Sequence, residues 1–311
     1  MEDPMKKIAF VFSGQGAQYP GMGQTLADAS SAAKAVFDLC DSIRPGTSAQ
    51  CFTGTKEELT ITSNTQPDMF AVEVAAAAAL VEAGITPDAL AGFSVGEIGA
   101  LAFSGALSVA DSFQLVCRRG ELMQEASNAA DTGMTAVVKL SPAQVEALAA
   151  RFDQVYPVNY NSPAQTVCAG LSSSMDGFKA AVKEAGGRAI PLRVAGAFHS
   201  PFMASAAQGL AEELKKYTFA APKYTLYSNV TGKPYEGVET YADMLSRQVI
   251  SPVRWQGIVE DLIANGVDTF IEVGPGNTLT GLIGKIDPNV KTYNVDSADS
   301  LSATIQEVTN G

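Results

Sequence analysis

Ser94 and His199 have the residue types and the setting for nucleophilic catalysis. Ser94 is at the centre of the pattern G-x-S-x-G, between Gly92 and Gly96, and Glu97 follows the pattern. Such a pattern positions a nucleophile when a strand precedes it and a helix follows, because the sharp turn then presents the hydroxyl at the helix N-terminus. Here "LAGF" has the character of a strand and "VGEIGALAF" that of a helix. We therefore predict a nucleophile elbow at Ser94, although the bare pattern also occurs by chance.

A serine nucleophile needs a base, and His199 is the only histidine of the chain. It stands in "GAFHSPFM", directly before a serine and a proline that have the pattern of a helix cap and first turn. A lone histidine can be structural, but loops at element boundaries often carry catalytic groups. We predict that His199 is the base. A conventional triad acid stays open among the aspartates between Ser94 and His199, which are Asp111, Asp131, Asp153 and Asp176.

Two glycine-rich turns, "SGQGAQ" and "GPGNTL", need to be weighed as nucleotide sites. A dinucleotide fingerprint starting at Gly14 or at Gly274 would need a small residue five positions later, where a tyrosine and a leucine stand. Neither turn fits. The first turn is better suited to an oxyanion hole, in which the backbone N–H of Gln15 pairs with that of Val95, the residue after the nucleophile.

Two adjacent arginines, Arg118 and Arg119, follow an apolar helical stretch in "LVCRRGELMQ". Both could be solvated, as arginine usually is. If one turned inward, its planar guanidinium would hold a carboxylate through two parallel hydrogen bonds.

The composition is that of a globular protein and excludes several function classes. The net charge of −12 argues against nucleic acid or an anionic membrane as the main partner. No apolar run approaches the ~18 residues of a membrane span or has the form of a signal peptide, so we expect a cytoplasmic protein. With one histidine and four cysteines that lack C-x-x-C spacing, we expect reduced thiols and no metal site.

Apolar runs that lead into glycine turns and then into helical periodicity recur as "KKIAFVF", "DALAGF" and "VDTFIEV". Such strands, alternating with helices, predict a parallel sheet covered on both faces. We expect an alanine-rich helix capped by Asn64 or Thr65, and further helical stretches over 200–216 and 240–265.

Residues 130–194 follow a different order, β-α-β-β-α-β, which is typical of a ferredoxin-like unit. Ser141 and Gln144 have the spacing of a capping box at its first helix. We therefore predict a large catalytic unit of residues 1–129 and 195–311 with residues 130–194 inserted as a small unit, and a ligand cleft between them.

Eight segments in register resemble the malonyl-CoA:acyl carrier protein transacylases and the related acyltransferase domains of fatty acid and polyketide synthases. The resemblance runs from about residue 7 to about residue 285 and is carried by "FVFSGQGAQYPGMG", "NTQPDMF", "GFSVGE", "CRRGELMQ", "VNYNSP", "GAFHSPFM", "SPVRW" and "EVGPGNTLTGL". It implies an α/β-hydrolase-like, mostly parallel sheet covered by helices, with an inserted ferredoxin-like α+β subdomain.

Carried over onto matching residues, the resemblance implies that Ser94 is the nucleophile and His199 the general base and later acid. The backbone N–H groups of Gln15 and Val95 would form the oxyanion hole. Arg119 would bind the free carboxylate of the malonyl group.

Three further residues complete the implied site. Gln248, in "SRQVISPVRW", would orient the histidine through its backbone carbonyl. Phe198 matches the malonyl-type version of "GAFH", in which the ring crowds a 2-methyl group. Phe93 departs from the family, which usually has histidine there, and would place an apolar ring beside the acyl pocket.

The implied reaction moves a malonyl group from malonyl-CoA, through a malonyl-serine ester, to the phosphopantetheine thiol of acyl carrier protein for fatty acid synthesis. The coenzyme A thioester and the carrier protein are then substrates, no cofactor is bound, and we expect a monomer. Three alternatives stay open: a stand-alone acyltransferase that supplies a polyketide synthase, a serine thioesterase or esterase, and a non-catalytic acyl-binding or scaffold protein.

Docking of an acidic carrier to this acidic chain would need a local basic face. Lys179, Lys183, Arg188 and Arg193 cluster in the predicted small unit and are either that face or an ordinary solvated one. Neither the natural start, at Met1 or Met5, nor the purpose of the tail after residue 290 can be read from the sequence.

Overall fold

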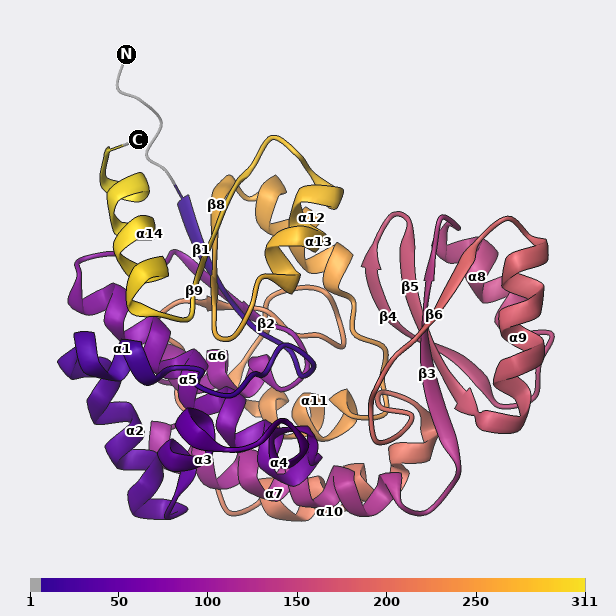
Figure 1. Ribbon diagram of the computed structural model, residues 1–311, viewed down its shortest axis with the longest axis horizontal. Coiled ribbons are helices and arrows are strands. Elements are labelled where there is room, and N and C mark those ends of the chain that lie inside the picture. Colours follow the sequence, from indigo (N-terminus) through magenta and orange to yellow (C-terminus); the bar gives the residue numbers. More distant parts are fainter. Residues whose placement is uncertain (1–6, 311) are drawn as a thin grey trace.

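Five short strands pair into one parallel sheet at the centre of the large unit in the computed structural model (Figure 1). The structure describes residues 7–310, so the choice between Met1 and Met5 lies outside the described residues. In spatial order the strands are β7 (Thr225–Leu226), β2 (Ala89–Gly92), β1 (Lys7–Phe12), β8 (Val267–Val273) and β9 (Lys291–Val295). Neighbouring strands all run parallel, and the tail after residue 290 supplies the edge strand β9. The predicted parallel sheet is confirmed.

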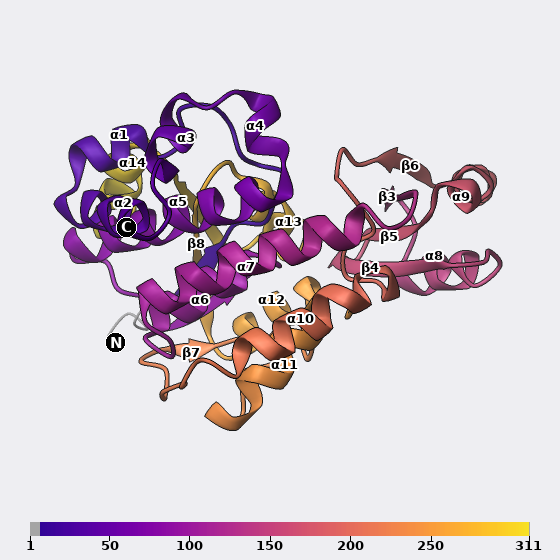
Figure 2. The same ribbon diagram turned by 90° about the horizontal axis from the view of Figure 1, so that it is seen from below.

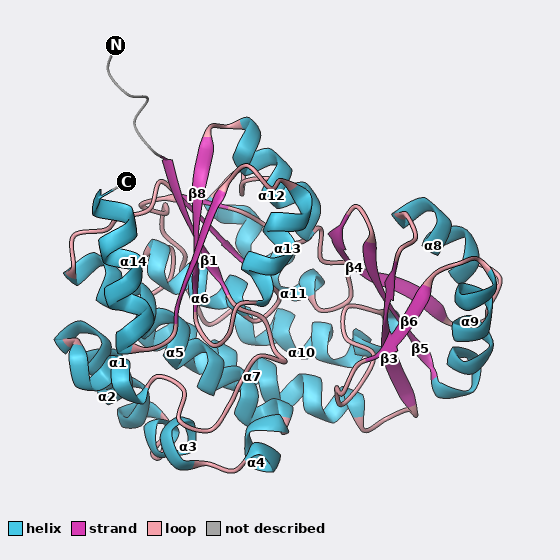
Figure 3. Ribbon diagram, turned by 45° about the horizontal axis from the view of Figure 1, so that its top comes forward, coloured by secondary structure: helices cyan, strands magenta, loops and turns pink. Residues whose placement is uncertain are grey.

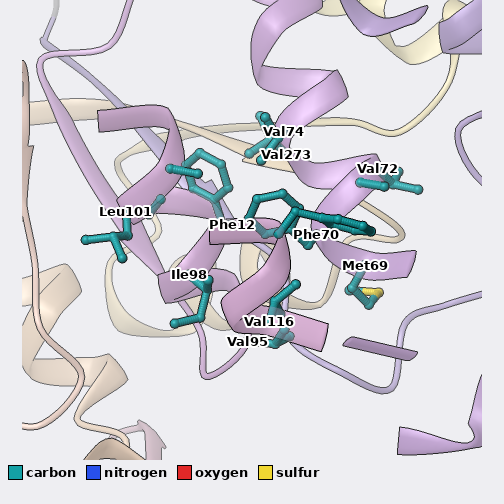
Figure 4. Close-up of a cluster of buried hydrophobic side chains, with 14 of the residues drawn as sticks. Phe12, Met69, Phe70, Val72, Val74, Val95, Ile98, Leu101, Val116 and Val273 are labelled. Atoms are coloured by element: carbon teal, nitrogen blue, oxygen red, sulfur yellow. The ribbon is translucent and has the colours of Figure 1, made fainter. Parts of the chain in front are cut away.

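The sheet is buried on both faces because successive strand residues point in opposite directions. Phe10 and Phe12 of β1 enter one core, and Ala9 and Val11 enter the other. The second core is closed by α12 (Trp255–Ala264) and α13 (Thr278–Ile286). Figure 4 shows part of the first core, in which Phe12 lies among residues that include Phe70 and Ile98.

The first core receives buried side chains from a larger set of helices. These are α1 (Gln24–Ala29), α2 (Ser31–Ile43), α3 (Thr47–Thr53), α4 (Lys56–Thr60), α5 (Thr62–Glu82), α6 (Gly96–Ser104), α7 (Val109–Ser127), α10 (Ala204–Leu214), α11 (Tyr241–Gln248) and α14 (Ala298–Asn310). Two short 3-10 helices, η1 (Pro201–Met203) and η2 (Val238–Thr240), precede α10 and α11. Figure 2 shows α7 and α10 running side by side toward the small unit. No helix within residues 7–310 is long and apolar enough to cross a bilayer.

The small unit is a four-stranded antiparallel sheet with two helices on one face (Figure 3). Its elements in chain order are β3 (Thr132–Val138), α8 (Pro142–Ala149), β4 (Val155–Ser162), β5 (Gln165–Leu171), α9 (Ser172–Glu184) and β6 (Arg188–Pro191). The spatial order β4-β5-β3-β6 and the antiparallel pairing are those of a ferredoxin-like unit. The capping box of Ser141 and Gln144 at α8 is confirmed.

Helix α5 begins at Thr62, so the predicted cap at Asn64 or Thr65 is wrong. The N–H of Thr62 donates to the side chain of Gln124 on α7 at 3.0 Å. This contact supplies the partner that a capping side chain would give, and it joins residues far apart in the chain.

The predicted stretch 240–265 divides into α11 and α12, because the connecting segment pairs with the small unit instead of continuing a helix. Val253 donates to Val158 of β4 at 2.8 Å and accepts from Tyr160 at 2.9 Å. The helix therefore ends at Gln248, whose carbonyl oxygen accepts from the Ser251 N–H at 3.2 Å and also faces the candidate site.

Candidate active site

Ser94 lies in the turn between β2 and α6, with a left-handed backbone at φ 56°. The two glycines of the pattern make this turn sterically allowed. A Cβ at Gly92 would collide with the carbonyl carbon of Gly96, and a Cβ at Gly96 would collide with the carbonyl oxygen of Phe12 on β1. The spacing of the glycines is therefore required by close backbone contact between strand and helix.

Two neighbours hold the strained turn in place. Val95 is buried in the first core, where Figure 4 shows it beside Ile98 and Val116. Asn229, which follows β7, accepts from the Ser94 N–H at 2.8 Å and donates to the Gly92 carbonyl at 2.6 Å. Such over-determination is what allows a non-glycine residue to keep a left-handed conformation.

Ser94 and His199 meet at hydrogen-bond distance. Ser94 Oγ lies 2.7 Å from His199 Nε2, and His199 Nδ1 lies 2.9 Å from the carbonyl oxygen of Gln248. A carbonyl only accepts, so Nδ1 carries the proton and Nε2 is the acceptor for the serine hydroxyl. This is the tautomer that a general base requires.

Ser94 and the Gln248 carbonyl lie at hydrogen-bond distance from the ring of His199, and none of the four aspartates that stayed open contacts it in the described part of the chain. Burial and the nearby positive charge of Arg119 lower the pKa of His199 to about 4, against the opposing effect of the Gln248 carbonyl. The imidazole is therefore neutral at pH 7.

Arg119 is buried, with 1% of its surface exposed, and points into the site. Nη1 donates to Oε1 of Gln66 at 2.7 Å. Nη2 donates to Oε1 of Gln248 at 2.7 Å and to Ser94 Oγ at 3.2 Å. Burial lowers its pKa to about 10, opposed by the carboxyls of Glu97 and Glu73, so the guanidinium remains charged. Arg118, by contrast, is partly exposed and pairs with Glu121.

The backbone N–H groups of Gln15 and Val95 have no hydrogen-bond acceptor within residues 7–310. Gln15 lines a pocket of about 220 Å³ that adjoins the elbow and extends to the small unit. The lining residues are Gly14, Gln15, Gly16, Phe93, Ala136, Asn159, Asn161, Gln165, Val167, Leu192, Thr278, Leu279 and Leu282. Phe93, the residue before the nucleophile, lines this pocket, whereas Ser94, His199 and Arg119 are not among its lining residues.

The two phenylalanines lie in different places. Phe93 is half-buried, lines the pocket and packs edge-on against Trp255 with ring centroids 5.6 Å apart. A Cβ at Gly14 would come within 2.8 Å of its ring, so the first glycine turn rests against Phe93. Phe198 is buried in the first core directly before His199.

Sequence reasoning assigned no role to three residues that hold the site together: Gln66, Glu97 and Asn229. Gln66 stands in "NTQPDMF" and Glu97 directly after the serine pattern, so both lie in segments that carried the resemblance. Asn229 follows β7, beside the end of β2, and a polar residue after a parallel strand is a usable signal for a site residue.

The four cysteines are free, and the described residues contain no group of three or more histidine, cysteine or acidic side chains that could hold a metal. Of the predicted basic cluster, Lys183, Arg188 and Arg193 are exposed, whereas Lys179 pairs with Asp176.

Comparison with known proteins gives a consistent result. Residues 9–310 match the family described as acyl transferase domain. The chain is 38% identical to the malonyl CoA-acyl carrier protein transacylase of Bacillus subtilis, over 97% of each chain. The crystal structure of malonyl CoA-acyl carrier protein transacylase from Clostridium perfringens is 36% identical and covers 98% of each chain, with a TM-score of 0.94. A malonyl-transacylase solved in complex with a type II PKS acyl-carrier protein is 34% identical, covers 97% of this chain and 100% of its own, and has a TM-score of 0.93. This chain therefore belongs to the acyl transferase family.

Proposed function

We propose that this chain transfers a malonyl group from malonyl-CoA to the phosphopantetheine thiol of an acyl carrier protein by a ping-pong reaction through Ser94. The observation that carries the proposal is the position of Ser94 Oγ, which contacts both the neutral Nε2 of His199 and the charged Nη2 of Arg119. A base and a carboxylate-binding group thus converge on one nucleophile. The names of the relatives support the same substrates.

In the first half-reaction, His199 Nε2 takes the hydroxyl proton as Ser94 Oγ attacks the thioester carbonyl. The N–H groups of Gln15 and Val95 hold the resulting oxyanion. The carbon–sulfur bond then breaks, the imidazolium returns its proton to the leaving coenzyme A thiol, and a malonyl-serine ester remains. The thiol of the carrier protein gives its proton to the same imidazole and attacks the ester, which restores Ser94.

The malonyl carboxylate would bind Arg119. Its two Nη atoms are held by the amide oxygens of Gln66 and Gln248, so the guanidinium plane is fixed before substrate arrives. Its Nε has no partner within the described residues, which leaves donor capacity for a carboxylate oxygen. An acetyl group would leave this capacity unused, which favours malonyl as the substrate.

The pocket beside Phe93 suits the pantetheine arm that both substrates share. The side-chain oxygens of Asn159 and Asn161 are buried there without hydrogen-bond partners in the described part of the chain. Unpaired buried acceptors favour a ligand that donates N–H groups, and the arm carries two amides. No bound cofactor is needed for this reaction.

The carrier protein would dock beside this pocket on the small unit. Leu192 lines the pocket and stands between exposed Arg188 and Arg193, next to the edge strand β6. Together with Lys183 these arginines form the basic edge, which would attract an acidic partner to an otherwise acidic protein.

Single-turnover acylation followed by addition of an acceptor tests the proposal. The protein is mixed with malonyl-CoA, separated from excess thioester, and divided between buffer and phosphopantetheinylated carrier protein. We expect a malonyl-protein that is stable in buffer and loses its acyl group to the carrier. Equal loss in buffer alone would make the protein a hydrolase, and no acylation at all would favour a binding protein. Carriers from fatty acid and polyketide synthesis, compared side by side, test our expectation that the former is preferred.

A further inference from the structure

We infer that Glu97 is a positioning residue for malonyl selectivity, because its carboxylate fixes the orientation of the Gln248 amide that holds Arg119. The inference rests on the proposed function and deepens it. The side chain of Glu97 contacts neither the hydroxyl of Ser94 nor the ring of His199, and it is fully buried one turn after Ser94.

Every hydrogen-bond partner of the Glu97 carboxylate can donate. Oε2 accepts from Nε2 of Gln248 at 2.5 Å, Oε1 accepts from the hydroxyl of Tyr235, and both oxygens lie 3.3 Å from the backbone N of Asn229. A buried carboxylate surrounded by donors is a fixed acceptor, and its partners are ordered by it.

The orientation of the Gln248 amide follows from these contacts. Its Nε2 faces the backbone oxygen of Ser94 at 2.9 Å, which can only accept, and Oε2 of Glu97, which accepts when the carboxyl is ionised. Burial raises the pKa of Glu97 to about 7, and the hydrogen bonds from Tyr235, Gln248 and Asn229 oppose this rise. The amide nitrogen of Gln248 must therefore point toward Glu97 and Ser94, and its oxygen Oε1 must point away from them. Nη2 of Arg119 lies on the side of the amide oxygen, at 2.7 Å from Oε1.

Without Glu97, one of the two acceptors that fix this amide is lost. A flipped amide would place its NH₂ group against the guanidinium, where donor faces donor. Arg119 would then lose one of the two amide oxygens that fix its plane. Since the plane of the guanidinium sets how it meets a carboxylate, selectivity for a malonyl group should fall more than the reactivity of the elbow.

The test measures the ratio of single-turnover acylation rates with malonyl-CoA and acetyl-CoA. We expect Glu97→Ala to lower this ratio about tenfold, the effect of losing one hydrogen bond to a charged group. Glu97→Gln should restore most of it, since its amide oxygen can face Gln248 while its NH₂ group faces the Tyr235 hydroxyl. This rescue is a readout that a mere loss of packing would not give.

Glu272 supplies a matched control. It is also fully buried, and its carboxylate accepts from the backbone N–H groups of Leu279 and Thr280 instead of contacting Gln248. Glu272→Ala should lower the thermal stability and leave the malonyl-to-acetyl ratio unchanged.

Gln248→Ala keeps the backbone carbonyl that faces His199 and removes the oriented amide, so it tests the idea even if Glu97→Ala does not fold. Its ratio should fall as in Glu97→Ala, and the double variant should fall no further. An unchanged ratio in Gln248→Ala, or a Glu97→Gln ratio as low as that of Glu97→Ala, would overturn the inference. A wild-type protein that takes up no malonyl group would instead refute the proposed function.

Discussion

Replacing Arg119 with alanine should abolish the preference for malonyl over acetyl while leaving the acylation chemistry in place. Arg119 has 1% of its surface exposed, and its charge is held by neutral amide oxygens. A malonyl carboxylate would form charge-assisted hydrogen bonds with it, each worth about 1.5–3 kcal/mol, or about 3–5 kcal/mol for a bidentate pair. We therefore expect Arg119→Ala to lower the malonyl rate by about two to four powers of ten.

Rapid mixing with each thioester, followed by quenching and intact-protein mass spectrometry, measures this prediction. The acetyl rate is the internal control, since an acetyl group makes no contact with the guanidinium through a carboxylate. It should change by less than about tenfold, a barrier difference of ~1.4 kcal/mol, which reports an intact elbow. If both rates fell by the same large factor in a folded variant, Arg119 would act on Ser94 and not on the carboxylate, and the reasoning would be refuted.

The other predictions concern the elbow, the base and the basic edge. Phe93→His should leave the malonyl transfer rate within about tenfold, because the base is His199; complete loss would mean that the elbow works differently. The acylation rate should be flat at neutral pH and fall only as pH drops through about 4, since protonation of His199 removes the base and its pKa is lowered to about that value; stopped-flow rates that already fall near pH 6.5 would contradict this. Lys183→Glu with Arg188→Glu should raise the KM for carrier protein and not that for malonyl-CoA in steady-state assays, and equal effects on both would refute docking at the basic edge.

Local features of the fold could be predicted from the sequence where the residues that interact lie close together in the chain. A Cβ at Gly92 would collide with the backbone of Gly96, only four positions later. The steric requirement for glycine is therefore visible within the G-x-S-x-G pattern itself. The same holds for the capping box at Ser141, which closes within one helical turn. The ferredoxin-like order followed from alternating apolar segments over 130–194.

Features that depend on distant partners could not be read in this way. Helix α5 starts at Thr62 because Gln124, on another helix, accepts its N–H. Asn229 forms hydrogen bonds with Ser94 and Gly92 because β7, which precedes it, pairs with β2. Glu97 accepts a hydrogen bond from Gln248, which lies 151 positions away in the chain. The sequence shows polar residues at these places, but only the folded chain shows which donors and acceptors they meet.

Locating the acyl group after reaction with malonyl-CoA tests the central claim most directly. Peptide mass spectrometry of the digested protein should place a single malonyl ester on Ser94. Ser94→Ala should carry no adduct, and holo carrier protein should remove the adduct from the unaltered protein. A malonyl group on another residue, or one that persists in Ser94→Ala, would contradict the account.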